Sequence, residues 1–467
     1  MVASLQRLTA RMSSRRLTLL LLLLALLARL FVGLLAVRGT FLIGEGRMQA
    51  ALAERMMEGE GFSIPREMLH PDIPPERSNP LLERTFEFYR RVDGFYGAMR
   101  PERPTTFLVP GYAVFLCGIY SVFGIGNHLA VRLVQLLLGM VTVALGLALA
   151  RRFLSRWRYA LAGLFIALNP FELYYEAIPA TQALFSLLFV GGLVLSIRLI
   201  DGPGWKTGLA CGLSWAAAFY VRPAALPVFL WTVPVVLVAG RFSRRAVLGA
   251  LLALVGFFAA MAPWMVRNDR VSGKALLLPT QGGVNLWEAV GRPLTDHFRD
   301  ETRGARTLYG PTREYWMGRV DSPELAEFPE FRDETELERD SVLYSRLSRF
   351  VSRNPVYYLH TMVLRFAELF KPFPLNAFSP IYILAGLASF FWVLVFAGGG
   401  SLIAAFRRGP AGLYLATSVW GYSLMHLITI SGTPHRVAID FPLIVLATIG
   451  LGHVWRRLRA SCRGGTV

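Results

Sequence analysis

A single carboxylate stands between two glycines where the first apolar run of the chain ends. Residues 44–63 read GEGRMQAALAERMMEGEGFS, and the first acidic residue in this stretch is Glu45. A carboxylate at the depth of the lipid headgroups can accept a proton from a hydroxyl group that is about to react. We therefore predict Glu45 as a catalytic residue.

The remainder of that stretch has the pattern of a surface helix. Met48, Leu52 and Met56 recur at i, i+4 and i+8, and Arg47 and Glu54 fall on another side. This periodicity predicts an amphipathic helix of about three turns that lies along the membrane surface. Glu54 is interpreted as part of the solvated face, and Arg47 as a candidate substrate-binding residue.

Three arginines stand at the outer ends of apolar runs. They are Arg222 in FYVRPAALP, Arg267 in APWMVRND and Arg436 in GTPHRVAIDFP, where His435 is the neighbouring residue. A guanidinium group matches the geometry of a phosphate. These four residues are predicted to bind an anionic lipid headgroup from outside, while the alternative at each arginine is simple anchoring of a helix at the interface.

Arg29 lies inside the first apolar run. An arginine in the middle of a membrane helix costs about 2.5–3.5 kcal/mol on insertion scales, so it needs a partner or a wet cavity. We expect either a buried partner or a role in substrate binding, and the alternative is a side chain that reaches back to the surface.

Composition identifies the environment in which these residues work. The chain has 467 residues, of which 54% are hydrophobic, and a net charge of +18. Its mean hydropathy is +0.45, and the arginines cluster between apolar runs as the positive-inside rule requires. These features predict an all-α polytopic membrane protein and make a nucleic-acid partner the weaker interpretation.

The apolar runs predict about ten transmembrane helices, with both termini in the cytoplasm. Most of the 31 acidic residues then fall in two outer loops. Residues 104–123 are apolar but contain two prolines, and we interpret them as a re-entrant or interfacial segment. The spans are placed at 17–37, 128–150, 159–176, 179–200, 207–222, 224–240, 246–266, 381–406, 411–430 and 437–455.

Three regions follow from this topology. Residues 1–267 form a transmembrane module that includes the first outer loop at 38–127. Residues 268–380 form the second outer loop with an interfacial helix at 354–374. Residues 381–467 form the C-terminal transmembrane helices.

Several motifs of soluble enzymes are absent from the sequence. The three cysteines are far apart, and neither H-E-x-x-H nor a P-loop occurs. We predict no cofactor and no metal ligands, although the acidic outer loops leave a divalent cation open. GLACG at 208–212 is a G-x-x-x-G pattern and predicts close helix packing.

Four segments together resemble a known family. PTTFLVPGYAVFLCGIYSVF, ALNPFELYYEAIPATQALF, FYVRPAALP and PWMVRNDRVSGKALLLPTQGGVNLW resemble segments of the bacterial polytopic glycosyltransferases of the GT-C superfamily. These are relatives of the protein O-mannosyltransferases and the lipid A aminoarabinose transferase (glycosyltransferase family 39-like). The resemblance covers roughly residues 17–300 and implies a GT-C fold and a polyprenyl-phosphate-linked sugar donor.

The resemblance also implies an acidic catalytic residue in the first outer loop, a place that Glu45 occupies. The family often has Thr-Glu where this chain has Thr181-Gln182. Glu172 and Glu176, which come a few residues earlier, are therefore candidates for a second acidic role in substrate binding.

The leading hypothesis is glycosyl transfer at the outer face of the bacterial inner membrane. The donor is a polyprenyl-phosphate sugar, the acceptor is a lipid, a glycan or a protein, and membrane lipids surround the chain. The alternative is a flippase or transporter of lipid-linked sugars, and a third interpretation is a scaffold for envelope assembly. No nucleic-acid partner is expected.

Overall fold

The computed structural model describes residues 12–36, 45–64, 103–291, 315–316, 318–320, 331, 333–372 and 380–464. Within these residues the regular elements are helices, with one isolated β-bridge between Ser63 and Pro104. Six of the described helices are long and apolar enough to cross a membrane by length and composition. The predicted all-α polytopic architecture is confirmed.

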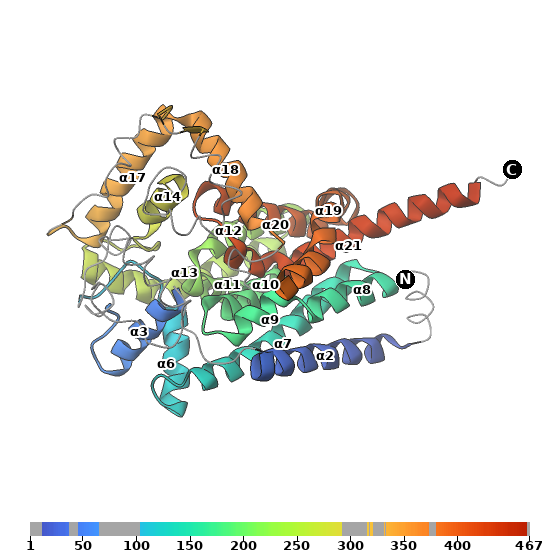
Figure 1. The fold of residues 1–467 in the computed structure, drawn as a ribbon, viewed down its shortest axis with the longest axis horizontal. Coiled ribbons are helices and arrows are strands. Elements are labelled where there is room, and N and C mark those ends of the chain that lie inside the picture. The colour runs from blue at the N-terminus through green and yellow to red at the C-terminus, as the bar shows by residue number, and fades with distance from the viewer. Residues whose placement is uncertain are drawn as a thin grey trace.

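Figure 1 shows how these helices are arranged. The first half of the chain contains α2 (Ser14–Leu30), the short π-helix η1 (Phe31–Ala36; called the π-turn below), α3 (Glu45–Met57), α6 (Gly111–Phe123), α7 (His128–Phe153), α8 (Arg156–Ala167), α9 (Pro170–Ala177), α10 (Thr181–Asp201) and α11 (Trp205–Val221). The second half contains the 3-10 helix η3 (Pro223–Ala225), α12 (Leu226–Ala239), α13 (Arg244–Ser272), α14 (Gly282–Gly291), α17 (Glu336–Arg353), α18 (Pro355–Leu369), α19 (Pro380–Arg407), α20 (Gly409–Ile428) and α21 (Thr433–Gly464).

The six long apolar helices are α2 with its π-turn, α7, α10, α13, α19 and α21. The other four predicted spans also fall on helices, namely α8 with α9, α11, α12 and α20. The span predicted at 159–176 is not one continuous helix, because the helix breaks between α8 and α9. Asn169 causes the break: its side chain accepts hydrogen bonds from the N–H groups of Phe171 and Glu172, and Pro170 starts the new helix.

Helix α6 occupies the segment that we interpreted as re-entrant or interfacial. It has 13 residues, which at about 1.5 Å per residue reach only about 20 Å. That length is short of the roughly 30 Å hydrocarbon core. This length agrees with a re-entrant or interfacial segment, which stays a prediction.

Helices α11 and α13 approach each other at the predicted G-x-x-x-G pattern. A Cβ atom on Gly208 would lie 2.1 Å from the carbonyl oxygen of Gly249, and one on Gly212 would lie 2.0 Å from that of Ala253. Only glycine allows two backbones to come this close. The packing prediction is confirmed.

Residues 268–380, which we predicted as the second outer loop, contain α14, α17 and α18. A capping box between Thr335 and Glu338 starts α17. The carboxylate of Glu336 then accepts hydrogen bonds from the Thr105 hydroxyl (2.8 Å) and the Thr106 N–H (2.6 Å). This contact fastens α17 to the segment that leads into α6.

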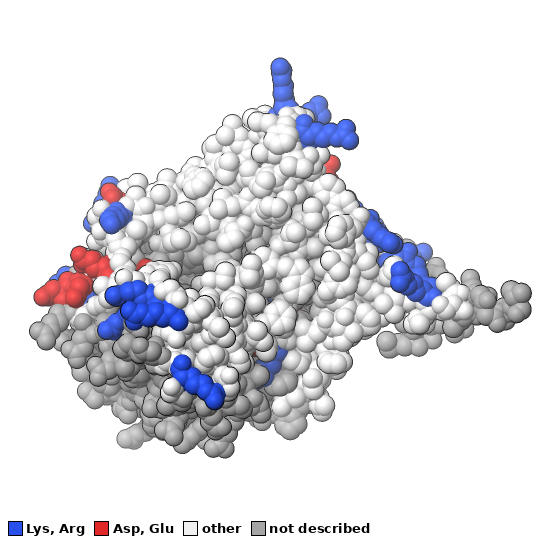
Figure 2. Space-filling model, turned by 90° about the horizontal axis from the view of Figure 1, so that it is seen from above, with Lys and Arg blue, Asp and Glu red and all other residues white. Residues whose placement is uncertain are grey.

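Different helices lie at the two ends of the bundle. Helix α2 begins and α21 ends on one side, whereas α3, α14 and α17 lie towards the opposite side (Figure 1). Figure 2 shows one face of the molecule, on which a broad uncharged area separates lysines and arginines that lie mostly towards the edges. The start of α2 and the end of α21 thus lie on one side of the bundle, and α3, α14 and α17 on the other.

Candidate active site

Helix α3 begins at Glu45, so this residue is the first of the helix instead of preceding it as expected. The side chain of Glu45 lies outside the described residues. The backbone of the next residue makes a close contact: a Cβ atom on Gly46 would lie 2.2 Å from the carbonyl oxygen of Pro179. The start of α3 therefore rests directly on the connection between α9 and α10.

Polar side chains of α7 hold this connection in place. The Gln135 amide donates to the carbonyl oxygens of Ile178 (2.6 Å) and Glu176 (3.2 Å), and Arg132 donates to that of Ala177 (2.7 Å). The Tyr112 hydroxyl of α6 donates to Gln135 in turn (2.6 Å). The sequence analysis missed Arg132 and Gln135, although two polar residues inside an apolar span were a readable signal.

Arg222 and His435 meet at the start of α10. The Arg222 guanidinium donates to the Thr181 hydroxyl (2.7 Å) and to Nδ1 of His435 (3.2 Å). Because a guanidinium group can only donate, Nδ1 of His435 is the acceptor and the ring carries its proton on Nε2. The His435 ring lies 4.5 Å from the ring of His426, measured between centroids. The structure thus brings two of the predicted substrate-binding residues together.

Arg29 is paired in the interior of the bundle. Its guanidinium donates to the Glu176 carboxylate at 2.7 Å, and the side chains are 1% and 0% exposed. Gly139 of α7 makes room for this carboxylate, since a Cβ atom there would lie 2.2 Å from Cδ of Glu176. The structure therefore places Arg29 in a buried ion pair and does not let it reach the surface.

A second buried ion pair lies on α21. Arg436 donates to Asp440 at 2.8 Å, and both side chains are fully buried. Its guanidinium carbon also lies 3.6 Å from the centroid of the Phe390 ring, and Asn169 donates to Asp440 at 3.3 Å. Arg436 was expected at an outer helix end, but the structure buries it among aromatic and acidic groups.

Glu172 lies one turn before Glu176 on α9 and is likewise buried. Among the described residues, no hydrogen bond of normal geometry reaches either of its carboxylate oxygens, and the Ser186 hydroxyl is the polar group that acts on them. The side-chain amide oxygen of Gln182, Oε1, is also buried and accepts no hydrogen bond within the described part of the chain. Glu172 and Glu176, the two candidates for a second acidic role, are therefore both buried.

Arg267 occupies a different setting from Arg222 and Arg436. Its guanidinium donates to the carbonyl oxygens of Thr105 (2.5 Å) and Phe62 (3.3 Å). It also lies over the indole of Trp264, 4.9 Å from the ring centroid. The three arginines therefore do not form a single cluster.

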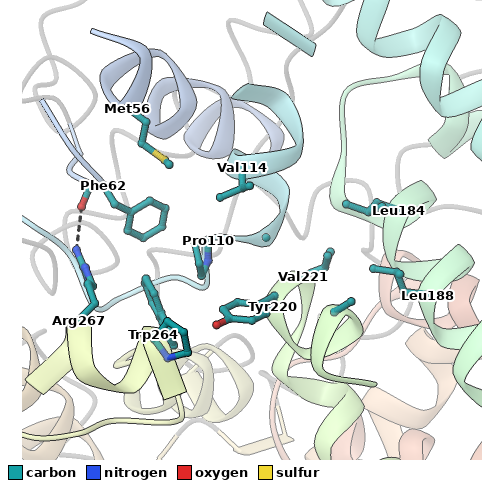
Figure 3. A pocket seen from close by; sticks show the side chains of 13 residues that line it. Met56, Phe62, Pro110, Val114, Leu184, Leu188, Tyr220, Val221, Trp264 and Arg267 are labelled. Atoms are coloured by element: carbon teal, nitrogen blue, oxygen red, sulfur yellow. Dashed lines mark hydrogen bonds between the residues drawn. The ribbon is translucent and has the colours of Figure 1, made fainter. Parts of the chain in front are cut away.

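Arg267 lines a cavity of about 590 Å³. Figure 3 shows Arg267 and Phe62 at one end of this cavity and Leu184 and Leu188 of α10 at the other. The walls between them are apolar or aromatic, with side chains from α3, α6, α11 and α13. We call this space the Arg267 cavity. An apolar space with one guanidinium at its end can take a molecule with a hydrocarbon chain and an anionic head.

The predicted substrate-binding residue Arg47 of α3 is partly buried and does not line the Arg267 cavity. No cluster of three or more His, Cys, Asp or Glu side chains in the described part of the chain could hold a metal ion.

The sequence matches no protein-family model and no curated protein. The structure is similar to that of the archaeal oligosaccharyltransferase AglB from Archaeoglobus fulgidus in complex with an inhibitory peptide and a dolichol-phosphate, at 12% identity and a TM-score of 0.47. That match covers 96% of this chain and 52% of the other, so the chain spans about half the length of AglB.

A second similar structure is ArnT from Cupriavidus metallidurans bound to undecaprenyl phosphate. The identity is 15%, the TM-score is 0.41, and the match covers 94% of this chain and 79% of that one. With both TM-scores below 0.5, these likenesses establish neither a family nor an activity for this chain.

Proposed function

We propose that this chain is a membrane glycosyltransferase that moves a sugar from a polyprenyl-phosphate-linked donor to an acceptor at the outer face of the bacterial inner membrane. The observation that carries the proposal is the Arg267 cavity. Its apolar walls suit a polyprenyl chain, and a guanidinium at one end suits the phosphate. Helix α3, which begins at Glu45, contributes Met56 to the wall of the same cavity.

In this proposal the acceptor hydroxyl attacks the anomeric carbon of the donor sugar. A new glycosidic C–O bond forms while the C–O bond to the lipid phosphate breaks, and the phosphate leaves with the electron pair. Glu45 takes the proton of the hydroxyl as the general base. Arg267 stabilises the negative charge that develops on the phosphate oxygen.

The proposal also gives roles to the other predicted residues. Arg222 and His435 sit at the start of α10, beside the connection on which α3 rests, and can contact the sugar or the acceptor. The buried residues Arg29, Glu176 and Arg436 position α9 and α21 around this connection. Glu172 stays a candidate for a second acidic role, because its buried carboxylate forms no ion pair among the described residues and has only the Ser186 hydroxyl acting on it as a hydrogen-bond donor.

A flippase or transporter of lipid-linked sugars is the alternative. A transport path needs charged groups or broken helices that line a cavity near the membrane midplane. The structure has buried charges in Arg29 and Glu176, and these residues line neither the Arg267 cavity nor the second cavity described below. A transport assay in liposomes that lack any acceptor separates the two functions.

The first experiment identifies the product, by mass spectrometry of envelope glycolipids and glycoproteins from a deletion strain. Transfer is then measured with the full-length protein in membranes and a labelled polyprenyl-phosphate sugar. Glu45→Gln should lower the rate by about 10²–10⁴-fold, the range for loss of a general base. Glu54→Gln, on the same helix, is the matched control and should retain the rate; full activity of Glu45→Gln would overturn the assignment.

Donor binding is tested separately from chemistry. Arg267→Gln should weaken binding of polyprenyl phosphate, because the phosphate loses its guanidinium partner. Arg270→Gln is the matched control, since Arg270 is exposed one turn further along the same helix. Equal binding by the two variants would remove Arg267 from the donor site.

A further inference from the structure

A second cavity, of about 540 Å³, lies where the end of α18 meets α19, α20 and α21. Its walls are apolar and aromatic, and include Phe370, Val393, Ala397 and Trp420. One charged side chain, Lys371, also lines it. We call this space the Lys371 cavity. It shares no lining residue with the Arg267 cavity.

The Lys371 cavity continues an apolar stripe on α18. Val356, Leu359, Val363 and Phe366 are 67%, 60%, 68% and 43% exposed, and their spacing of three or four residues places them on one face of the helix. Phe366 belongs both to this stripe and to the cavity wall. A helix with an open apolar face beside membrane-spanning helices lies in the interface of the bilayer, so the cavity opens at the level of the lipid headgroups.

Helix α19 forms part of the cavity wall, and another side of the same helix is exposed. Helix α19 contributes Val393, Leu394 and Ala397 to the cavity, while Phe391 and Val395 on another side of the same helix are exposed. Helix α19 is one of the six that can cross a membrane. The wall that α19 gives to the cavity is therefore apolar, as an acyl chain requires, and it belongs to a helix that can cross the hydrocarbon layer.

The polar end of the cavity carries a positive charge. The ammonium group of Lys371 is half-buried, and Glu368 is the acidic residue that acts on it electrostatically. A partly desolvated ammonium group at headgroup depth attracts anionic lipid phosphate. We propose that the Lys371 cavity binds an acyl chain of an anionic bilayer phospholipid, with the phosphate of that lipid at Lys371.

Arg436 connects the main chain at the Lys371 cavity to the buried core. The Arg436 guanidinium donates to the main-chain carbonyl oxygens of Leu369 (3.4 Å) and Lys371. The same guanidinium pairs with Asp440. A lipid that orders residues 369–371 therefore also stabilises the Arg436–Asp440 pair, and lipid binding should raise the melting temperature of the protein.

The test uses the full-length protein in nanodiscs of phosphatidylcholine that contain a minor fraction of phosphatidylglycerol. Native mass spectrometry after detergent extraction counts the lipids that stay bound. The wild type should retain phosphatidylglycerol over phosphatidylcholine, and Lys371→Gln should reduce that preference about fivefold, the effect of one basic residue near a membrane surface. An unchanged preference in Lys371→Gln would overturn the proposal.

A second pair of variants tests whether the acyl chain of the lipid occupies the Lys371 cavity. Ala397→Phe fills the cavity and should abolish retention of phosphatidylglycerol, whereas Leu402→Phe, at a 63% exposed position on the same helix, should leave it unchanged. Binding of polyprenyl phosphate at the Arg267 cavity should be the same in all these variants, so the result does not depend on the proposed enzyme activity. Displacement of the retained phospholipid by polyprenyl phosphate would assign the cavity to the donor and overturn the proposal.

Discussion

Arg29 of α2 and Glu176 of α9 form an ion pair at 2.7 Å inside a membrane-spanning bundle, and neither side chain is exposed to any notable extent. The pair joins α2, the first of the described helices, to α9, which precedes the connection on which α3 rests. Arg29 donates in addition to the carbonyl oxygen of Ala167, at the end of α8 (3.3 Å). One side chain of α2 thereby contacts both α8 and α9.

Removal of one partner of this pair should destabilise the protein strongly. Arg29→Met leaves the Glu176 carboxylate buried without its charge partner, which should cost about 3–5 kcal/mol. The double variant Arg29→Met/Glu176→Leu should recover much of that loss, because it leaves no buried charge. Thermal unfolding in detergent measures both.

The exposed pair between Arg152 and Asp201 is the control. Its side chains are 48% and 38% exposed, and Arg152→Met should change stability by no more than about 1 kcal/mol. Equal effects of Arg29→Met and Arg152→Met would contradict the structural role of the buried pair.

A methyl group at Gly46 should disturb catalysis more than folding. In Gly46→Ala the new Cβ atom would meet the carbonyl oxygen of Pro179 at 2.2 Å, so the start of α3 must move. A displacement of about 1 Å at a catalytic group can cost about 100-fold in rate. Transfer assays combined with thermal unfolding separate the two effects.

Gly118→Ala is the matched control for that experiment. Gly118 lies on α6, and no atom lies within 4 Å of a Cβ built there. This variant should keep both rate and stability. If Gly46→Ala also kept the full rate, the position of Glu45 at the start of α3 would be irrelevant to the reaction.

Close packing of α11 and α13 predicts a stability effect. Gly212→Leu forces its side chain against the carbonyl oxygen of Ala253, which a Cβ atom alone would meet at 2.0 Å. Overpacking of this kind costs about 1–3 kcal/mol. Gly191→Ala, whose nearest atom would be at 3.6 Å, should be tolerated, and melting temperatures of the two variants test the difference.

The contact between α14 and α17 should respond to pH. Burial raises the pKa of the Asp340 carboxyl above its ordinary 3.8, although the Gly283 N–H that donates to it acts in the opposite direction. The folded state therefore holds the proton more tightly than the unfolded state does. The stability contributed by this group falls as pH rises from about 3.8 through the higher pKa of the folded state.

Asp340→Asn removes this titration and keeps an oxygen that can accept from Gly283. The variant should gain stability relative to wild type as pH rises through that window. Thermal unfolding at several pH values, or hydrogen exchange of the α17 amides, measures the change. Parallel profiles of variant and wild type would show that Asp340 does not control the pH response of this contact.

Local properties of the sequence were enough to predict much of the architecture. The apolar runs marked the helices because the thickness of the bilayer dictates their length and composition. The period of Met48 and Leu52 predicted α3, and both side chains are buried as that period requires. Gly208 and Gly212 predicted a close helix contact, since small residues spaced four apart form a flat stripe on any helix.

The pairing of charges could be decided only by the tertiary structure. Arg29 and Glu176 are separated by 147 positions in the sequence, and Arg222 and His435 by 213, so no local pattern connects them. The three outer arginines looked equivalent in sequence, yet one is buried in an ion pair, one contacts a histidine and one lines an apolar cavity. Hydropathy and periodicity depend on neighbours along the chain, whereas burial and ion pairing depend on which helices pack together.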